Sequence, residues 1–208
     1  EALLTSNYLI PDGMSIVWAS RFLGAEVIPQ RRIAGWDLFS FEMEQLNRKG
    51  GRCMFMGSSE NVLEMIRQRA AIDFPNIEVV TYSPPYKKEF SADDNRAIVE
   101  AINECNPDLL WIGMTAPKQE KWVYEHWNEL NIDCHVGAIG AVFDFYAGTV
   151  KRAPLWWQRH GLEWLYRLIR EPRRMWRRYL IGNSKFLWYC LLNIFHSDTL
   201  NTKLQVLK

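Results

Sequence analysis

Three short apolar segments, each ending at a glycine and followed by a polar segment, constrain the fold of this chain most. They occupy residues 52–57, 109–113 and 134–140. Buried parallel strands are unbroken apolar runs, and a glycine at the carboxyl end lets the chain turn tightly into a helix. A fourth segment, Ile77–Tyr82, has the composition of another strand. The alternation predicts an α/β fold with a Rossmann-like, doubly wound and mostly parallel sheet.

The alternation stops near Thr149, and a segment rich in arginine and tryptophan follows. We therefore expect an α/β catalytic core over residues 1–149 and a helical appendage over residues 150–208. Within Lys151–Lys185, ten basic residues face two acidic ones, a net charge of +8, whereas the whole chain carries +1. The remainder of the chain is therefore acidic, and the appendage is predicted to bind a negatively charged partner.

Local patterns predict several helix boundaries. Ser91 and Asp94 have the spacing of a capping box at the start of a helix. Pro172 predicts a break between two helices of the appendage, because an interior proline removes a backbone donor and clashes with the preceding turn. The apolar run Phe186–Phe195 holds ten residues, whereas a membrane-spanning helix takes roughly 20. This run suits either a helix in the membrane interface or one packed on the domain.

Composition narrows the class of protein. With 208 residues and 48% hydrophobic residues, the chain can bury one sizeable core. Its four cysteines form no CxxC pair, which favours reduced thiols in the cytosol and disfavours a zinc site. No secretory signal opens the chain, and its first residue is Glu1, so we expect a processed or trimmed N-terminus.

Two turns carry candidate chemistry near the N-terminus. The Pro11-Asp12-Gly13 turn offers either an ordinary turn aspartate or a carboxylate held at a strand-to-helix junction, where it can act as a general base. Arg32 precedes a Gly-Trp-Asp turn that ends at Asp37, and both residues are predicted substrate contacts. The pattern suits a guanidinium that binds an anion, and an ordinary surface arginine beside an N-cap aspartate explains it nearly as well.

Further candidates follow the predicted strands. Lys118 and Gln119 come directly after Pro117, which suits a first helical turn. They would lie at a helix N-terminus, where free amides and the helix dipole attract phosphate. A glycine near the end of a strand lets the backbone approach a ligand, although close packing between a strand and a helix explains such a glycine as well. We include three of them among the predicted substrate contacts: Gly57, Gly137 and Gly140.

The sequence lacks the motifs that usually accompany several kinds of chemistry. The sequence contains no DxD, no GxGxxG and no GxxxxGK[ST] motif, and its four histidines show no metal-ligand spacing. These absences disfavour a magnesium-bound diphosphate, a dinucleotide site of the usual kind and a P-loop. We therefore expect an activity that needs neither metal nor cofactor.

Together the motifs resemble the WecG/TagA/CpsF family of bacterial glycosyltransferases, and they cover most of the chain in the family's order. The matching pieces are Pro11–Gly13 with Val17–Ala19, Arg32–Leu38, Gly113 with Ala116–Glu120, Gly137–Phe143, Lys151–Pro154 and Gly161–Leu168. The family usually has another strand and helix ahead of the PDG turn, whereas only eleven residues precede Asp12 here. We expect either a trimmed sequence or the loss of what that segment contributes.

The resemblance implies an inverting transfer of a sugar, of the N-acetylmannosamine type or a related hexose. The implied donor is a UDP-sugar, and the implied acceptor is a polyprenyl-diphosphate-linked sugar at the inner face of the cytoplasmic membrane. The product would serve a surface polysaccharide or cell-wall polymer. Asp12 becomes the base, and Arg32 and Gln119 become substrate contacts. The appendage then supplies Arg152, Arg159 and Arg167 for the diphosphate, and Arg173, Arg174, Trp176, Arg177 and Arg178 for the membrane.

Other readings of the same residues stay open. A nucleic-acid-binding module would explain the Arg/Trp segment, but it leaves the acidic remainder and the two turns unexplained. A catalytically inactive membrane adaptor and a nucleotide-dependent oxidoreductase on a similar sheet are further alternatives, the last disfavoured by the missing glycine-rich fingerprint. The oligomeric state, a homo-oligomer included, is not determined by the sequence.

Overall fold

The computed structural model describes residues 1–192, apart from the side chains of Arg174 and Arg178. The predicted membrane contacts of these two arginines therefore lie outside the described part of the chain. The last three residues of the apolar run, 193–195, also lie outside it.

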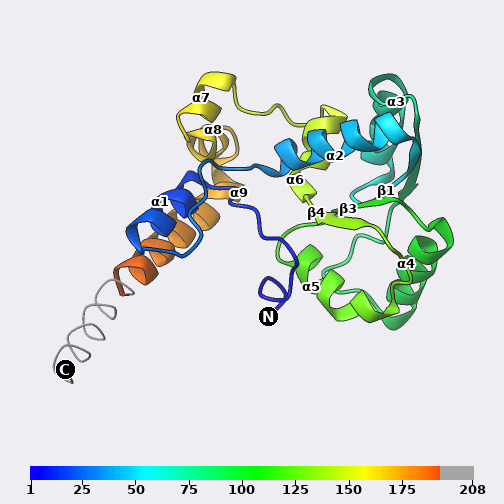
Figure 1. The fold of residues 1–208 in the computed structure, drawn as a ribbon, viewed down its shortest axis with the longest axis horizontal. Helices are drawn as coiled ribbons and strands as arrows, with labels where there is room; N and C mark the ends of the chain where they lie inside the picture. The colour runs from blue at the N-terminus through cyan, green and yellow to red at the C-terminus, as the bar shows by residue number, and fades with distance from the viewer. Residues whose placement is uncertain (193–208) are drawn as a thin grey trace. The chain divides into compact units, whose positions relative to one another are not determined.

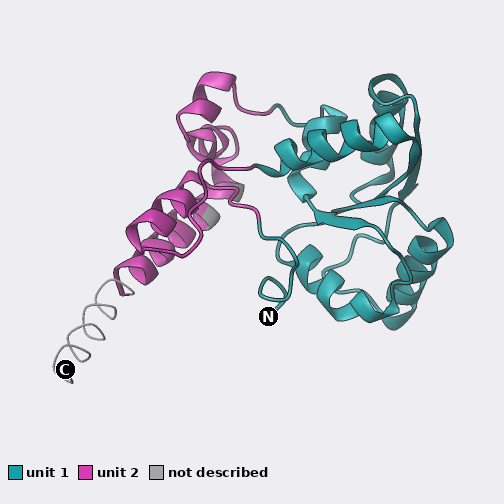
Figure 2. Ribbon diagram, in the orientation of Figure 1, with its two compact units in different colours: residues 1–9, 34–151 teal, residues 10–33, 152–208 magenta. Residues whose placement is uncertain are grey.

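The chain forms two compact units, drawn in different colours in Figure 2. Unit 1 joins residues 1–9 to residues 34–151, and unit 2 joins residues 10–33 to the segment that begins at Arg152. Each unit is thus assembled from two separate stretches of sequence. The sequence alone did not indicate that residues 10–33 pack with the C-terminal segment.

Unit 1 contains a four-stranded sheet. Its strands are β1 (Gly51–Gly57), β2 (Ile77–Tyr82), β3 (Leu109–Gly113) and β4 (His135–Ala138). The spatial order is β2-β1-β3-β4, and every pair of neighbours is parallel (Figure 1). These strands coincide with the four predicted apolar segments, so the predicted parallel α/β fold is confirmed.

One face of the sheet packs against three helices through an aromatic core. The helices are α2 (Gly35–Lys49), α3 (Glu60–Asp73) and α6 (Gly140–Ala147). Phe39 of α2 lies 4.9 Å from Tyr146 of α6 and 5.7 Å from Trp111 of β3, measured between ring centroids. Burial raises the pKa of the Tyr146 hydroxyl. This layer gives the sheet its largest buried side chains.

The other face packs against α4 (Ala92–Cys105) and α5 (Lys118–His126), and α5 runs into a short 3-10 turn at Trp127–Glu129. Side chains alternate along each strand, so Met54 and Met56 face this layer while Phe55 faces the other. Helices on both faces of a parallel sheet define the doubly wound class.

Unit 2 is helical in its described part. It contains α1 (Met14–Phe22), α7 (Leu155–Arg159), α8 (Glu163–Arg170) and α9 (Pro172–Trp176), followed by a π-helical turn (Arg177–Ile181) and further helix over residues 182–192. Helix α8 ends at Arg170 and α9 begins at Pro172, so the predicted break is confirmed.

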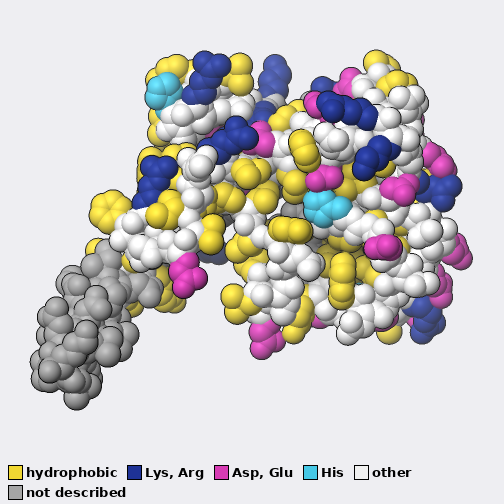
Figure 3. All heavy atoms as spheres, in the orientation of Figure 1, with side chains coloured by type: hydrophobic (Ala, Val, Ile, Leu, Met, Phe, Trp, Pro, Cys, Tyr) yellow, Lys and Arg dark blue, Asp and Glu magenta, His cyan; other side chains and the backbone are white. Residues whose placement is uncertain are grey.

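Large apolar side chains are exposed on several helices of unit 2, and the space-filling view shows hydrophobic atoms at its surface (Figure 3). They include Ile16, Trp18, Trp156, Ile169, Trp176, Leu180, Leu187 and Trp188. Over residues 1–192, no helix combines the length and the apolar character needed to cross a bilayer.

Candidate functional site

The carboxyl ends of β1 and β3 meet at the switch point of the sheet, where ligands bind in doubly wound folds. Gly57 pairs with Gly113 in the register of these strands, and the N–H of Ser58 donates a 3.0 Å hydrogen bond to the Gly113 carbonyl. A Cβ on Gly57 would lie 2.5 Å from the same carbonyl oxygen, and Gly57 has φ +118°. Only glycine permits this approach, so Gly57 lets the ends of β1 and β3 lie close together.

Gln119 links two loops at the same edge. Its side chain is 5% exposed, and its Oε1 accepts a 3.2 Å hydrogen bond from the N–H of Gly140, the first residue of α6. Its Nε2 donates to Glu120 Oε1 at 2.8 Å. A Cβ on Gly140 would collide with the carbonyl oxygen of Met114, so the two loops are in close contact. Gln119 therefore positions the start of α6 beside the loop that follows β3.

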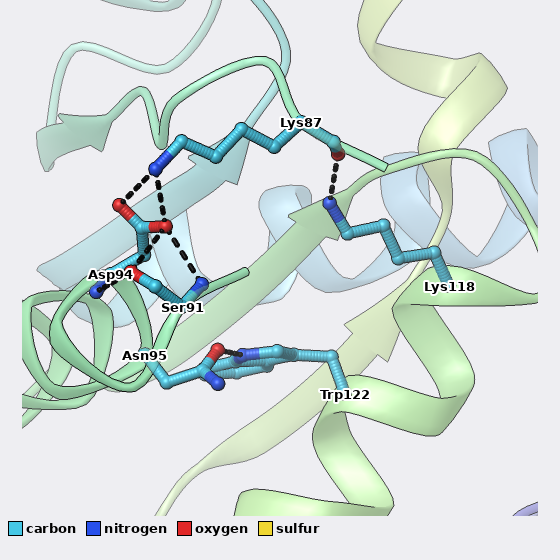
Figure 4. A network of polar contacts seen from close by, with 6 residues as sticks. All are labelled: Lys87, Ser91, Asp94, Asn95, Lys118 and Trp122. Atoms are coloured by element: carbon cyan, nitrogen blue, oxygen red, sulfur yellow. Dashed lines mark hydrogen bonds and ion pairs between the residues drawn. The ribbon is translucent and has the colours of Figure 1, made fainter. Parts of the chain in front are cut away.

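Lys118 begins α5, as predicted, and its ammonium group is engaged within unit 1 (Figure 4). Its Nζ donates a 2.7 Å hydrogen bond to the carbonyl of Lys87 and lies 3.4 Å from the ring centroid of Phe90. Partial burial lowers the pKa of Lys118. These contacts hold the loop between β2 and α4 against the N-terminus of α5.

The same loop also forms an ion pair with the helix that follows it. Lys87 Nζ lies 2.7 Å from Asp94 Oδ2, and this oxygen also accepts a 2.8 Å hydrogen bond from the Ser91 N–H, which closes the predicted capping box (Figure 4). The hydrogen bond from Lys87, helped by those from Ser91, lowers the pKa of Asp94 to about 2. The loop is thus fixed at Lys87 and at its junction with α4.

Two further predicted contacts of unit 1 have structural partners. A Cβ on Gly137 would collide with the Trp111 ring, so this glycine makes room for that side chain between β3 and β4. Asp37 Oδ2 accepts a 2.9 Å hydrogen bond from the N–H of Ala34 and caps α2. Their roles as substrate contacts stay predictions.

In unit 2 the PDG turn immediately precedes α1. Asp12 is exposed, and α1 begins at Met14. The sequence suggested a strand-to-helix junction here, but residues 1–13 contain no strand, so the turn lies between irregular chain and a helix. The carbonyl of Pro11 accepts a 3.0 Å hydrogen bond from the Ile33 N–H. This bond brings the neighbouring residues Asp12 and Arg32 into the same part of the unit.

Arg32 and Arg152 share one carboxylate. Arg32 Nη2 lies 2.8 Å from Glu163 Oε2, and Arg152 Nε lies 3.3 Å from Glu163 Oε1. The three side chains are 15–18% exposed. Two guanidinium groups thus meet one carboxylate in a place partly removed from water, where charges interact more strongly than at an open surface.

A glycine turn places Glu163 beside the start of α1. Gly161 has φ +70°, and a Cβ there would lie 3.0 Å from Met14 Cγ. The loop between α7 and α8 therefore packs directly on the helix that follows the PDG turn. Unit 2 thus gathers the predicted base and two predicted anion ligands, Asp12, Arg32 and Arg152.

The remaining predicted residues of the appendage lie on its helices. Arg159 is exposed at the end of α7, and Arg167 is half-buried on α8. Arg173 and Trp176 lie on α9, and the guanidinium carbon of Arg177 lies 5.3 Å from the Trp176 ring centroid. Their functional assignments stay predictions.

Sequence reasoning missed Glu163. It named the motif that contains this residue but gave the carboxylate no role. A signal was available, because Glu163 is one of only two acidic residues within Lys151–Lys185. An acid among many basic residues is surrounded by candidate cationic partners.

No three side chains of histidine, cysteine, aspartate or glutamate gather into a metal-binding group within residues 1–192. The expectation of metal-independent activity stays a prediction.

Comparison with known proteins shows which family this chain resembles. The chain matches the family described as Glycosyl transferase WecG/TagA/CpsF over residues 1–199. A relative from Bacillus spizizenii is 36% identical over 181 residues, which are 86% of this chain and 67% of the relative. One from Bacillus subtilis is 33% identical over 180 residues, with the same coverage of 86% and 67%. Both bear the name N-acetylglucosaminyldiphosphoundecaprenol N-acetyl-beta-D-mannosaminyltransferase.

The parallel α/β sheet and these matches define the protein as a glycosyltransferase. Within that class, the chain belongs to the WecG/TagA/CpsF family.

Proposed function

We propose that this protein transfers an N-acetylmannosamine-type sugar from a UDP-sugar to an N-acetylglucosamine carried on a polyprenyl diphosphate, with inversion at the anomeric carbon. The names of the two Bacillus relatives support the transferred sugar and the acceptor. The UDP donor rests on the family resemblance and on the cationic cluster of unit 2. The product belongs to the synthesis of a cell-wall or surface polymer.

Asp12 acts as the general base in this proposal. The acceptor hydroxyl oxygen attacks the anomeric carbon while its proton passes to the Asp12 carboxylate. The bond between that carbon and the diphosphate oxygen breaks, and its electron pair leaves with UDP. A positioned general base contributes about 10²–10⁴-fold to such a reaction. The exposure of Asp12 at a helix start lets an acceptor reach it.

Arg32 and Arg152 stabilise the leaving diphosphate. Their guanidinium groups are planar donors that match phosphate oxygens, and they neutralise the charge that builds up as UDP leaves. The single observation that carries the proposal is the hydrogen bond from Ile33 to Pro11. It brings the base and the arginine cluster together within one compact unit.

The C-terminal helices of unit 2 bind the membrane surface in this proposal, since the acceptor is a lipid. Trp176 is 43% exposed and Trp188 62% exposed on the described helical stretch, and arginines accompany them on α9. Aromatic rings at the level of the headgroups and cations near lipid phosphates are the usual contacts of interfacial helices.

A direct transfer assay tests the proposal. Purified protein is incubated with UDP-N-acetylmannosamine and a short polyprenyl-diphosphate N-acetylglucosamine, and the disaccharide lipid is quantified by mass spectrometry. We expect a product with inverted anomeric configuration and one UDP released per transfer. UDP release without a disaccharide product, or transfer only from another nucleotide sugar, would overturn the assignment.

The Asp12→Asn variant tests the base. We expect transfer to fall by about 10²–10⁴-fold while the dissociation constant for UDP and the circular dichroism spectrum stay unchanged, because only the proton acceptor is removed. Asp133→Asn is the matched control, since Asp133 is an exposed aspartate of unit 1. Near wild-type turnover of a folded Asp12→Asn protein would refute the role.

A further inference from the structure

We propose that Glu163 is a positioning residue, whose carboxylate holds Arg32 and Arg152 as a preformed pair for the diphosphate of a nucleotide. This inference rests on the proposed function for the identity of the ligand. Glu163 itself does not touch the reacting atoms. It acts through the two arginines, one on each of its oxygens.

The geometry of the cluster supports this role. The two carboxylate oxygens are divided between the partners, with Oε2 2.8 Å from Arg32 and Oε1 3.3 Å from Arg152. The side chains are only 15–18% exposed, so water screens the two guanidinium groups weakly. Without the carboxylate the two like charges would repel each other and separate. With it, both are kept at one location.

The cluster also joins the two segments of unit 2. Glu163 lies 131 residues from Arg32 in the sequence but 11 residues from Arg152. Arg32 is followed by Ile33, whose N–H is bonded to the carbonyl that precedes Asp12. Glu163 thus ties the N-terminal segment that carries the base to the C-terminal segment. Loss of the carboxylate loosens this tie as well as the arginine pair.

A competing interpretation makes the opposite prediction. If Glu163 merely occupied the arginines in place of the ligand, its neutralisation would raise the local charge by one unit and strengthen anion binding. If it positions them, its neutralisation weakens binding, because the guanidinium groups no longer start in the receiving arrangement. The sign of the change in affinity separates the two.

Titration calorimetry measures the affinity of the Glu163→Gln variant for UDP and for inorganic pyrophosphate, and so gives the sign of the change. We expect both ligands to bind about tenfold or more weakly, roughly the loss of one charge-assisted hydrogen bond. Glu163→Asp keeps the charge and should recover part of the affinity. Glu171→Gln is the matched control, because it removes the other acid within Lys151–Lys185 and changes the net charge equally. We expect it to bind both ligands like the wild type.

A double-mutant cycle checks that Glu163 acts through the arginines. In an Arg32→Lys/Arg152→Lys background, Glu163→Gln should weaken UDP binding far less than it does alone, because the groups it positions are already changed. In the transfer assay, Glu163→Gln should raise KM for the donor more than it lowers kcat. Circular dichroism and thermal melting establish that each variant is folded.

Three results would overturn the inference: unchanged or tighter UDP binding by folded Glu163→Gln, an equal loss in Glu171→Gln, or a wild-type protein that binds neither UDP nor pyrophosphate. Each is distinguishable from failure of the proposed function. That failure appears as missing disaccharide product from a wild-type protein, whether or not the protein binds UDP.

Discussion

Replacing Gln119 by methionine tests whether this buried amide holds the loops at the carboxyl edge of the sheet. Methionine has a similar length, so the volume of the site is nearly kept while both hydrogen bonds of the amide disappear. The Gly140 N–H loses its acceptor, and Glu120 Oε1 loses the donor that lies 2.8 Å away. The other oxygen, Glu120 Oε2, is buried and accepts no hydrogen bond from the described residues.

The expected magnitude follows from these two losses. A buried N–H left unsatisfied costs about 1–3 kcal/mol, and a lost hydrogen bond to a charged group about 1.5–3 kcal/mol. Both losses arise from one side chain and share its relaxation, so we expect a total destabilisation of about 3 kcal/mol. Against a typical stability of about 5–15 kcal/mol, this is a large fraction.

Urea unfolding followed by circular dichroism measures the effect. With a slope of about 2 kcal/mol per molar urea, the midpoint should fall by roughly 1.5 M. Gln68→Met is the matched control, because the Gln68 amide makes a 2.8 Å hydrogen bond to Glu64 on the exposed surface of α3. We expect it to cost under about 0.5 kcal/mol. Equal midpoints for the two variants would refute the reasoning.

Three further predictions follow from the charges of the chain. Excess EDTA should leave transfer nearly unchanged, because the proposed site stabilises the diphosphate with arginines; complete loss of transfer, restored by Mg²⁺ or Mn²⁺, would contradict this. Changing the four arginines near Trp176 to glutamate should weaken flotation with anionic liposomes by about a thousandfold at low salt, at about 1 kcal/mol per cation, while transfer to a short soluble acceptor persists. These arginines are Arg173, Arg174, Arg177 and Arg178. The pKa of Asp94 is lowered to about 2, so its ion pair stabilises the fold above the unfolded pKa of about 4 and is lost as pH falls from about 4 to about 2. Asp94→Asn should therefore remove acid sensitivity in that window of a melting series, and an unchanged pH profile would contradict the pairing.

Most of the sheet was predictable from the sequence, because the signals are local. Buried parallel strands are mostly apolar, which is why the glycine-ended segments identified three of the strands. The β-branched composition of Ile77–Tyr82 identified the fourth, an edge strand with an exposed Glu78. The capping box at Ser91 and the helix break at Pro172 are likewise properties of a few neighbouring residues. The family resemblance drew on the same local motifs.

The contacts that define the candidate site were not predictable in this way. The sequence placed Gln119 at a helix start, but its burial and its bond to Gly140 depend on how two separate loops pack. It also suggested a strand ahead of Asp12, whereas the structure has irregular chain there. That turn receives its support from Ile33 instead, a partner that no local pattern indicates.

The sequence by itself determined the parallel α/β class, the positions of the turns and the uneven distribution of charge, since each depends on short-range steric and solvation rules. Only the tertiary structure decided that residues 10–33 pack with the C-terminal segment and that Glu163 joins Arg32 to Arg152. A contact between residues 131 positions apart produces no local pattern in the sequence. Its partners are chosen by the packing of both segments, which bring their charges together in one partly buried place.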